Sequence, residues 1–213
     1  MPYKSGSMHG MSEQPHTKNA VRECHPRRVI SDADIDNLLH ELRLLVPSAT
    51  LCFKTDSRLQ QAIGALVRPF NPTYLTEYTT VMNGKIWLPS RDFLRSKSHE
   101  WLYALIRHEG VHLRDMKRFP GVFQLSYLLL LPSGLTFRAY WEWRAYKVSL
   151  QTQFELYGVI SDQYLEHLVE RFTGPSYLFM WPFPRHIRRV LQRERERIYQ
   201  RMHMVSGPRS GRE

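Results

Sequence analysis

Two histidines and a glutamate stand together in the segment His108-Glu109-Gly110-Val111-His112. Side chains four residues apart lie one above the other on the same face of an α-helix, so two imidazoles at this spacing can bind one metal ion. Glu109 points about 100° away from His108 around such a helix. Its carboxylate is therefore placed to take a proton from a water molecule that zinc has made acidic. The pattern predicts a catalytic zinc site with Glu109 as the general base.

The sequence around this motif predicts a helix that turns both histidines inward. Trp101 and Leu105 fall on the same helical stripe as His108 and His112, at steps of three and four residues. The alternative, a surface helix with two hydrated imidazoles, fits this apolar stripe poorly. Gly110 inside the motif costs roughly 1 kcal/mol of helix propensity relative to alanine, which indicates that another element packs closely there.

A catalytic zinc ion has three protein ligands and a water molecule, so a third ligand must come from another segment. The best candidate is Glu142, in a predicted helix over residues 136–149. Ala139, Ala145 and Ser149 share the face of Glu142, and such small side chains allow a close approach to another helix. Two other acidic residues compete for this role: Glu155 and Glu166.

The combination of His108, Glu109 and His112 with a later helical Glu142 and Ala145 resembles the gluzincin branch of the zincin metallopeptidases. The short chain is similar to the minimal single-domain members, the minigluzincins, and the resemblance covers roughly residues 74–155. It implies a Zn²⁺ ion held by His108, His112 and Glu142, with Glu109 as the catalytic base acting on a peptide or protein substrate.

Such families often add a residue that stabilises the oxyanion of the reaction. The resemblance does not assign it to one residue of this chain. Four candidates lie near Glu142 in sequence: Arg138, Tyr140, Arg144 and Tyr146.

Length and composition predict one folded domain. The chain has 213 residues, of which 42% are hydrophobic and 12% aromatic. The expected class is α+β, a mostly helical zincin-like domain with a small twisted sheet, over residues 28–205. Residues 1–27 and 206–213 are expected to form a disordered arm and tail. Only two cysteines are present, so a metal ion would be bound by histidine and carboxylate side chains.

The chain is basic, with a net charge of +10 and many arginines between residues 185 and 201. A positive net charge of this size favours contact with nucleic acid or an anionic surface. The alternative function is therefore a nucleic-acid or partner-binding module with a vestigial or structural zinc site. Basic, solvated helix faces are common, however, and the hydrolase is the preferred hypothesis.

The longest apolar run, residues 122–131, is too short to span a bilayer and is expected to be a buried packing element. A membrane partner is disfavoured on this ground. Residues 1–27 contain no apolar run typical of a signal peptide. The expectation is a cytoplasmic protein, or one exported by a route that leaves no such mark.

Asn83-Gly84 separates two β-prone runs, residues 74–82 and 85–88, and predicts a hairpin. Residues 85–88 have two interpretations. They form either an open sheet edge that pairs with an extended substrate, or a strand that packs under the histidine helix.

Overall fold

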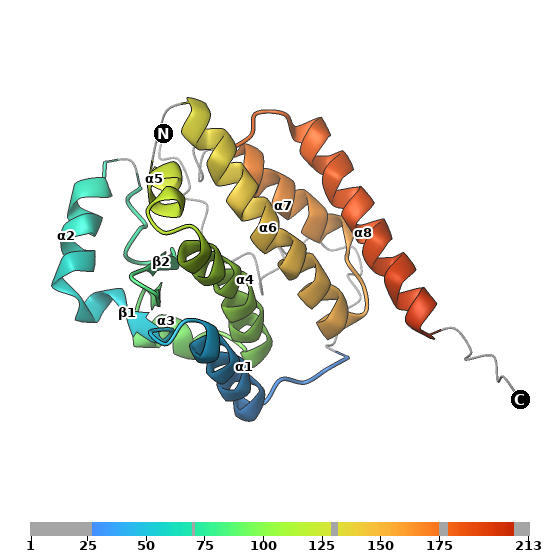
Figure 1. Ribbon diagram of the computed structural model, residues 1–213, viewed down its shortest axis with the longest axis horizontal. Helices are drawn as coiled ribbons and strands as arrows, with labels where there is room; N and C mark the ends of the chain where they lie inside the picture. Colours follow the sequence, from blue (N-terminus) through green and yellow to red (C-terminus); the bar gives the residue numbers. More distant parts are fainter. Residues whose placement is uncertain (1–26, 70, 129–131, 175–178, 207–213) are drawn as a thin grey trace, which may run out of the picture.

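The computed structural model describes residues 27–69, 71–128, 132–174 and 179–206. The chain is mostly helical with one small sheet, which confirms the α+β class (Figure 1). Nearly all of the expected disordered arm and tail lies outside the described residues. Arg27 belongs to the folded part, because its backbone N–H donates to the carbonyl of Leu156 at 2.6 Å.

The elements follow one another with short connections. In chain order they are α1 (Asp32–Leu45), β1 (Leu51–Phe53), the 3-10 helix η2 (Lys54–Asp56), α2 (Arg58–Val67), β2 (Thr80–Met82), β3 (Lys85–Leu88), α3 (Arg91–Arg95), α4 (His99–Arg118), α5 (Val122–Leu128), α6 (Pro132–Tyr157), α7 (Asp162–Thr173) and α8 (Pro184–Ser206). Serine hydroxyls cap the first turns of five helices in the described part of the chain: Ser31, Ser57, Ser90, Ser98 and Ser161.

The sheet has the strand order β1-β3-β2, with β3 parallel to β1 and antiparallel to β2. The predicted hairpin joins β2 and β3, and its two turn residues, Asn83 and Gly84, have φ angles of 53° and 71°. Asparagine and glycine tolerate this left-handed conformation, which matches the twist of the flanking strands. Because β3 has a neighbour on each side, the interpretation of residues 85–88 as an open edge is wrong. The other interpretation, a strand that packs under the histidine helix, is confirmed by the contacts between α4 and β3. The edges belong to β1 and β2.

The expected first strand of the hairpin is shortened by a buried lysine. Lys54 is fully buried, and its Nζ donates to the carbonyls of Tyr74 and Tyr78 at 2.7 and 2.8 Å. The ammonium group also lies 3.7 Å from the centroid of the Tyr74 ring. Burial lowers the pKa of Lys54 to about 7. These contacts hold the backbone before β2 in turns, so only Thr80–Met82 continues as a strand.

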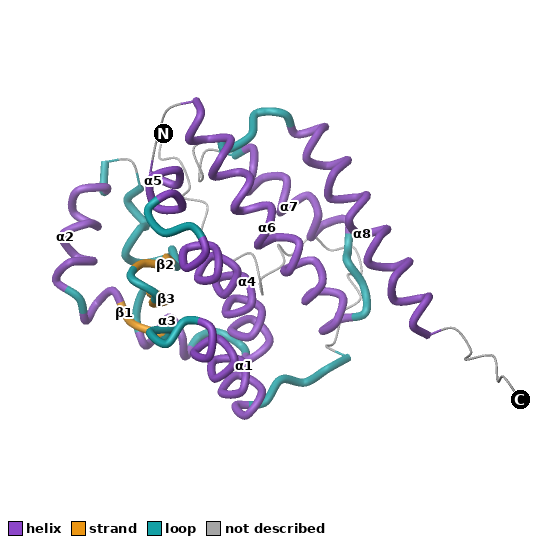
Figure 2. Tube along the Cα trace, viewed as in Figure 1, coloured by secondary structure: helices purple, strands orange, loops and turns teal. Residues whose placement is uncertain are grey.

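Helix α4 is the central element of the fold. It contacts α1, β2 and β3 on one side and α6 on the other, while α7 and α8 pack beyond α6 (Figure 1). Figure 2 shows the three strands grouped on the α2 side of α4, away from α7 and α8. One core cluster joins α1, α4 and the sheet, and a second joins α6, α7 and α8. Leu150 and Leu156 place α6 in both clusters.

Residues 129–131 of the expected apolar run 122–131 lie outside the described residues. The side chains described at its start are only partly buried, which does not fit the expectation of a buried packing element. Helix α5 buries Phe123 and Ser126 but exposes Val122 and Leu125 by 60% and 63%. No helix in the described residues is long and apolar enough to cross a membrane.

Close packing of α1 on α4 explains the glycine inside the motif. A Cβ atom at Gly110 would lie 2.9 Å from Cδ2 of Leu42, which is itself 1% exposed. We expect Gly110→Val to lower the free energy of unfolding by about 2 kcal/mol, because an overpacked core forces neighbouring side chains to shift. Urea denaturation measures this change.

A double-mutant cycle tests the cause. Leu42→Ala removes the side chain that the new methyl groups would meet, so the two substitutions together should cost clearly less than the sum of their separate costs. Additive costs would show that the destabilisation comes from somewhere other than this contact.

Candidate metal centre

The helix that carries the motif forms as its sequence predicts. Ser98 accepts a hydrogen bond from the Trp101 backbone N–H at 3.2 Å, and α4 then runs without interruption to Arg118. Trp101 and Leu105 are buried, which confirms the apolar stripe. His112 on the same stripe is 4% exposed, so the interpretation of two hydrated imidazoles is wrong.

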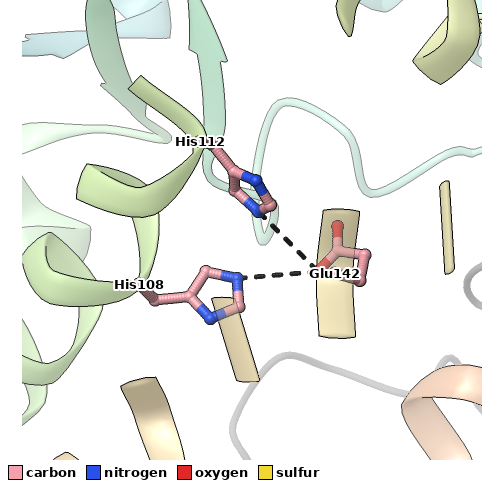
Figure 3. Close-up of side chains that lie close together, drawn as sticks. All are labelled: His108, His112 and Glu142. Carbon is pink, nitrogen blue, oxygen red and sulfur yellow. Dashed lines mark ion pairs between the residues drawn. The ribbon is translucent and has the colours of Figure 1, made fainter. Parts of the chain in front are cut away.

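The structure brings the three expected ligands together. Nε2 of His108 and Nε2 of His112 lie 3.6 and 3.8 Å from Oε2 of Glu142. Figure 3 shows both imidazoles directed from α4 toward the Glu142 carboxylate on α6. Ligand atoms of a tetrahedral zinc ion lie about 3.4 Å apart, given zinc–ligand bonds of about 2.1 Å. The donor set and its spacing therefore fit a zinc ion.

Ser149 determines which nitrogen of His108 is available for a metal. Its hydroxyl donates to the Ala145 carbonyl at 3.3 Å and lies 2.9 Å from Nδ1 of His108. When the single hydroxyl proton is donated to the Ala145 carbonyl, Oγ is free to accept the proton of Nδ1–H, as metal binding through Nε2 requires. This tautomer leaves the lone pair of Nε2 directed at the Glu142 side of the site. Hydrogen bonds of this kind orient metal-binding histidines and raise their basicity.

The charge of the buried carboxylate depends on the two imidazoles. Burial by itself would raise the pKa of Glu142, but its interactions with His108 and His112 outweigh burial and hold the pKa well below its usual range. Glu142 is only 3% exposed. A buried anion beside two imidazole nitrogens is an environment suited to a bound cation.

The proposed base lies in the same buried region. Glu109 is buried, and burial raises the pKa of its carboxyl to about 7. The charges of His108 and Lys54 oppose this rise, while that of Glu142 adds to it. A carboxylate with a pKa near neutrality can both accept and return a proton at physiological pH. This property suits general acid–base catalysis.

Two ion pairs between α4 and α6 set the register of the ligands. Arg144 donates to both oxygens of the buried Asp115 carboxylate, at 2.9 and 2.8 Å. Arg107 on α4 pairs with Glu155 on α6. Each helix contributes one cation and one anion, which supports an antiparallel pairing. On α4 the two histidines lie between the two contacts, and on α6 Glu142 lies two residues before Arg144.

The same contacts decide between the competing candidates. Glu155 is bound to Arg107, and Glu166 pairs with Arg188 at 2.6 Å, so the structure places neither beside the histidines. Among the described residues, His108, His112 and Glu142 are the metal-compatible group of histidine and carboxylate side chains.

Of the four candidates for an oxyanion-stabilising residue, Tyr146 makes a ring contact with one of the proposed ligands. Its buried ring is 4.9 Å from the ring of His108, centroid to centroid. Tyr140 is half exposed and its ring contacts that of Trp141. Arg144 is bound to Asp115.

Sequence reasoning placed Ser149 on the face of Glu142 only as a small side chain, and it missed the contacts that Ser149, Asp115 and Lys54 make around the site. Ser149 lies seven residues after Glu142 and Asp115 lies seven after His108, and this spacing of two helical turns was the available signal. No local pattern marks Lys54, since a lysine at the end of a short strand is usually exposed.

Comparison of the chain with protein-family models, with curated proteins and with solved structures finds no match. Its function must therefore be inferred from its side chains.

We expect Ser149→Ala to weaken zinc binding roughly 10- to 100-fold, because Nδ1 of His108 loses its acceptor and the imidazole is no longer oriented. Competition with a zinc chelator measures the affinity. Thr152→Val is the matched control, since Thr152 also bonds to a carbonyl of its own helix, that of Val148, at 2.8 Å. Equal zinc affinities for wild type and Ser149→Ala would contradict the role given to this hydroxyl.

Proposed function

We propose that this chain is a zinc-dependent hydrolase, of the metallopeptidase class, with a zincin-like fold of the gluzincin type. The observation that carries the proposal is the meeting of His108, His112 and Glu142 from two helices, with Glu109 buried beside them. The HExxH pattern supplies two histidine ligands and a base, and a catalytic zinc site also needs a third ligand, which Glu142 would provide here.

The residues have distinct roles in the proposed reaction. His108, His112 and Glu142 would hold the zinc ion, which when bound polarises a scissile carbonyl and acidifies water. Glu109 accepts a proton from the attacking water and then donates it to the leaving nitrogen. Tyr146, through its contact with His108, is the best-placed candidate to donate a hydrogen bond to the oxyanion.

An extended peptide would bind along β2. This strand pairs only with β3 among the described residues, and α4 packs against it. A free strand edge offers backbone donors and acceptors to a peptide in extended conformation. Thr80–Met82 therefore replaces residues 85–88 as the proposed substrate-binding edge.

The alternative of a nucleic-acid-binding module has less support. Several arginines of α8 are held by acidic side chains of the same protein, as in Arg188 with Glu166 and Arg195 with Asp162. Such pairs reduce the positive charge available to a polyanion, although Arg185, Arg189 and Arg193 of α8 have no ion-pair partner among the described residues. We do not propose this function.

We expect Glu109→Gln to retain about one zinc per chain, as wild type should, and to lower the rate of peptide hydrolysis roughly 10²- to 10⁴-fold, because the amide cannot accept the proton. Elemental analysis gives the zinc content, and mass spectrometry of a digested peptide mixture gives the rate. Glu41→Gln, at an exposed position on α1, is the matched control. Hydrolysis at the wild-type rate in Glu109→Gln would refute the assignment of the base.

We expect His108→Ala to lose most of its zinc during dialysis, because two ligands hold the ion much less tightly than three. His40→Ala, at an exposed position on α1, should keep the zinc content of wild type. A wild-type protein without zinc, or His108→Ala with full zinc content, would contradict the proposed metal centre.

A further inference from the structure

Large apolar side chains are exposed on three neighbouring segments. Val122 and Leu125 on α5, Phe137 in α6 and Phe183 before α8 are each more than half exposed. We call these four residues the apolar edge. Isolated exposed side chains of this kind are normal, but a group contributed by several elements at one end of a protein indicates an interaction surface.

The segments of the apolar edge lie at one end of the molecule. In Figure 1 the start of α6, the connection into α8 and the start of α8 line the upper end, with α5 beside α6. Contacts agree with this view, since α5 packs against α6. Ala139 of α6 and Met180 of the connection belong to one core cluster.

Positive charge accompanies the apolar edge, and negative charge is missing from its segments. Residues 116–141 and residues 171–193 contain no aspartate or glutamate. Arg185, Arg189 and Arg193 are exposed and have no ion-pair partner among the described residues. They stand four residues apart, so they form one stripe along α8.

Apolar and basic side chains share one hollow of the surface at the start of α8. Trp181, Phe183, Arg185 and Arg189 line this shallow pocket, together with two prolines and His186. Aromatic rings beside guanidinium groups are typical of surfaces that lie at the boundary between water and lipid headgroups.

We propose that the apolar edge and the Arg185–Arg189–Arg193 stripe form a docking surface for an anionic lipid bilayer. Exposed aliphatic and aromatic side chains enter the headgroup region, while the arginines lie against anionic lipids. The aliphatic side chains of Val122 and Leu125 favour a bilayer over nucleic acid, because nucleic acid binding relies on charge and on ring stacking. In this proposal the described part of the chain rests on the membrane surface, and none of its helices spans the bilayer.

Docking in this orientation brings the bilayer near the metal centre. Helix α5 exposes Val122 and Leu125 on its outer side, and the ring of buried Phe123 lies 5.9 Å from that of His112. One short helix therefore separates the proposed lipid surface from a proposed ligand. The docking surface does not depend on the proposed hydrolase activity.

Vesicle flotation tests the proposal directly. We expect the full chain to float with vesicles of phosphatidylcholine and phosphatidylglycerol, to bind pure phosphatidylcholine far more weakly, and to be released by high salt. Glu109→Gln should bind the vesicles as well as wild type does, which separates docking from catalysis.

Two pairs of substitutions test the two parts of the surface. Val122→Asp with Leu125→Asp should abolish flotation, whereas Leu59→Asp with Leu66→Asp, at exposed positions on α2, should not. Arg185→Gln with Arg189→Gln should weaken partitioning roughly 30-fold, the factor expected for two charges at an anionic surface. Arg58→Gln with Arg68→Gln, at exposed positions at the two ends of α2, removes the same charge and should have little effect.

Circular dichroism and thermal unfolding establish that every variant is folded before it is compared. The proposal is overturned if wild type does not bind anionic vesicles at millimolar lipid. The proposal is also overturned if the control substitutions on α2 reduce vesicle binding as much as the substitutions in the docking surface do. Displacement of the protein from vesicles by a single-stranded oligonucleotide that binds the same arginines would also overturn the proposal, because the surface would then be a nucleic-acid-binding site.

Discussion

Helices α4 and α6 have to hold a buried carboxylate against two imidazoles, and most other features of the fold serve this contact. Charged groups lose hydration on burial, so Glu142 is stable inside the protein only where His108 and His112 meet it closely. The ion pairs Arg144–Asp115 and Arg107–Glu155 join the same two helices. A shift of one helix along the other would break both pairs and the site together.

The interior around this contact is unusually polar for a small domain. Lys54, Glu109, Asp115 and Glu142 are all buried, although lysine and carboxylate side chains are rarely buried without a partner. Each of these side chains has charged or hydrogen-bonding neighbours. Their burial nevertheless makes the folded state less stable than apolar side chains of similar volume would. Lys54, Glu109 and Glu142 have shifted pKa values, and such groups are typical of functional sites.

Local features of the chain were predictable from sequence because they depend on interactions between residues a few positions apart. Ser98 caps α4 through its own first turn, and Asn83-Gly84 forms a hairpin turn that few other residue pairs allow. The four-residue spacing of His108 and His112 places them on one helical face wherever the helix packs. The pairing of these two imidazoles is therefore a property of the sequence by itself.

Contacts between distant segments were decided only by the tertiary structure. The sequence left three acidic residues as possible third ligands, and helix packing brought Glu142 to the histidines while Arg107 and Arg188 engaged Glu155 and Glu166. Packing also decides the strand order, which leaves β2 and not β3 at an edge of the sheet. It likewise decides which side of α5 is exposed. Helix periodicity specifies which side chains share a face, but the element that covers that face is set by the summed packing of the whole chain.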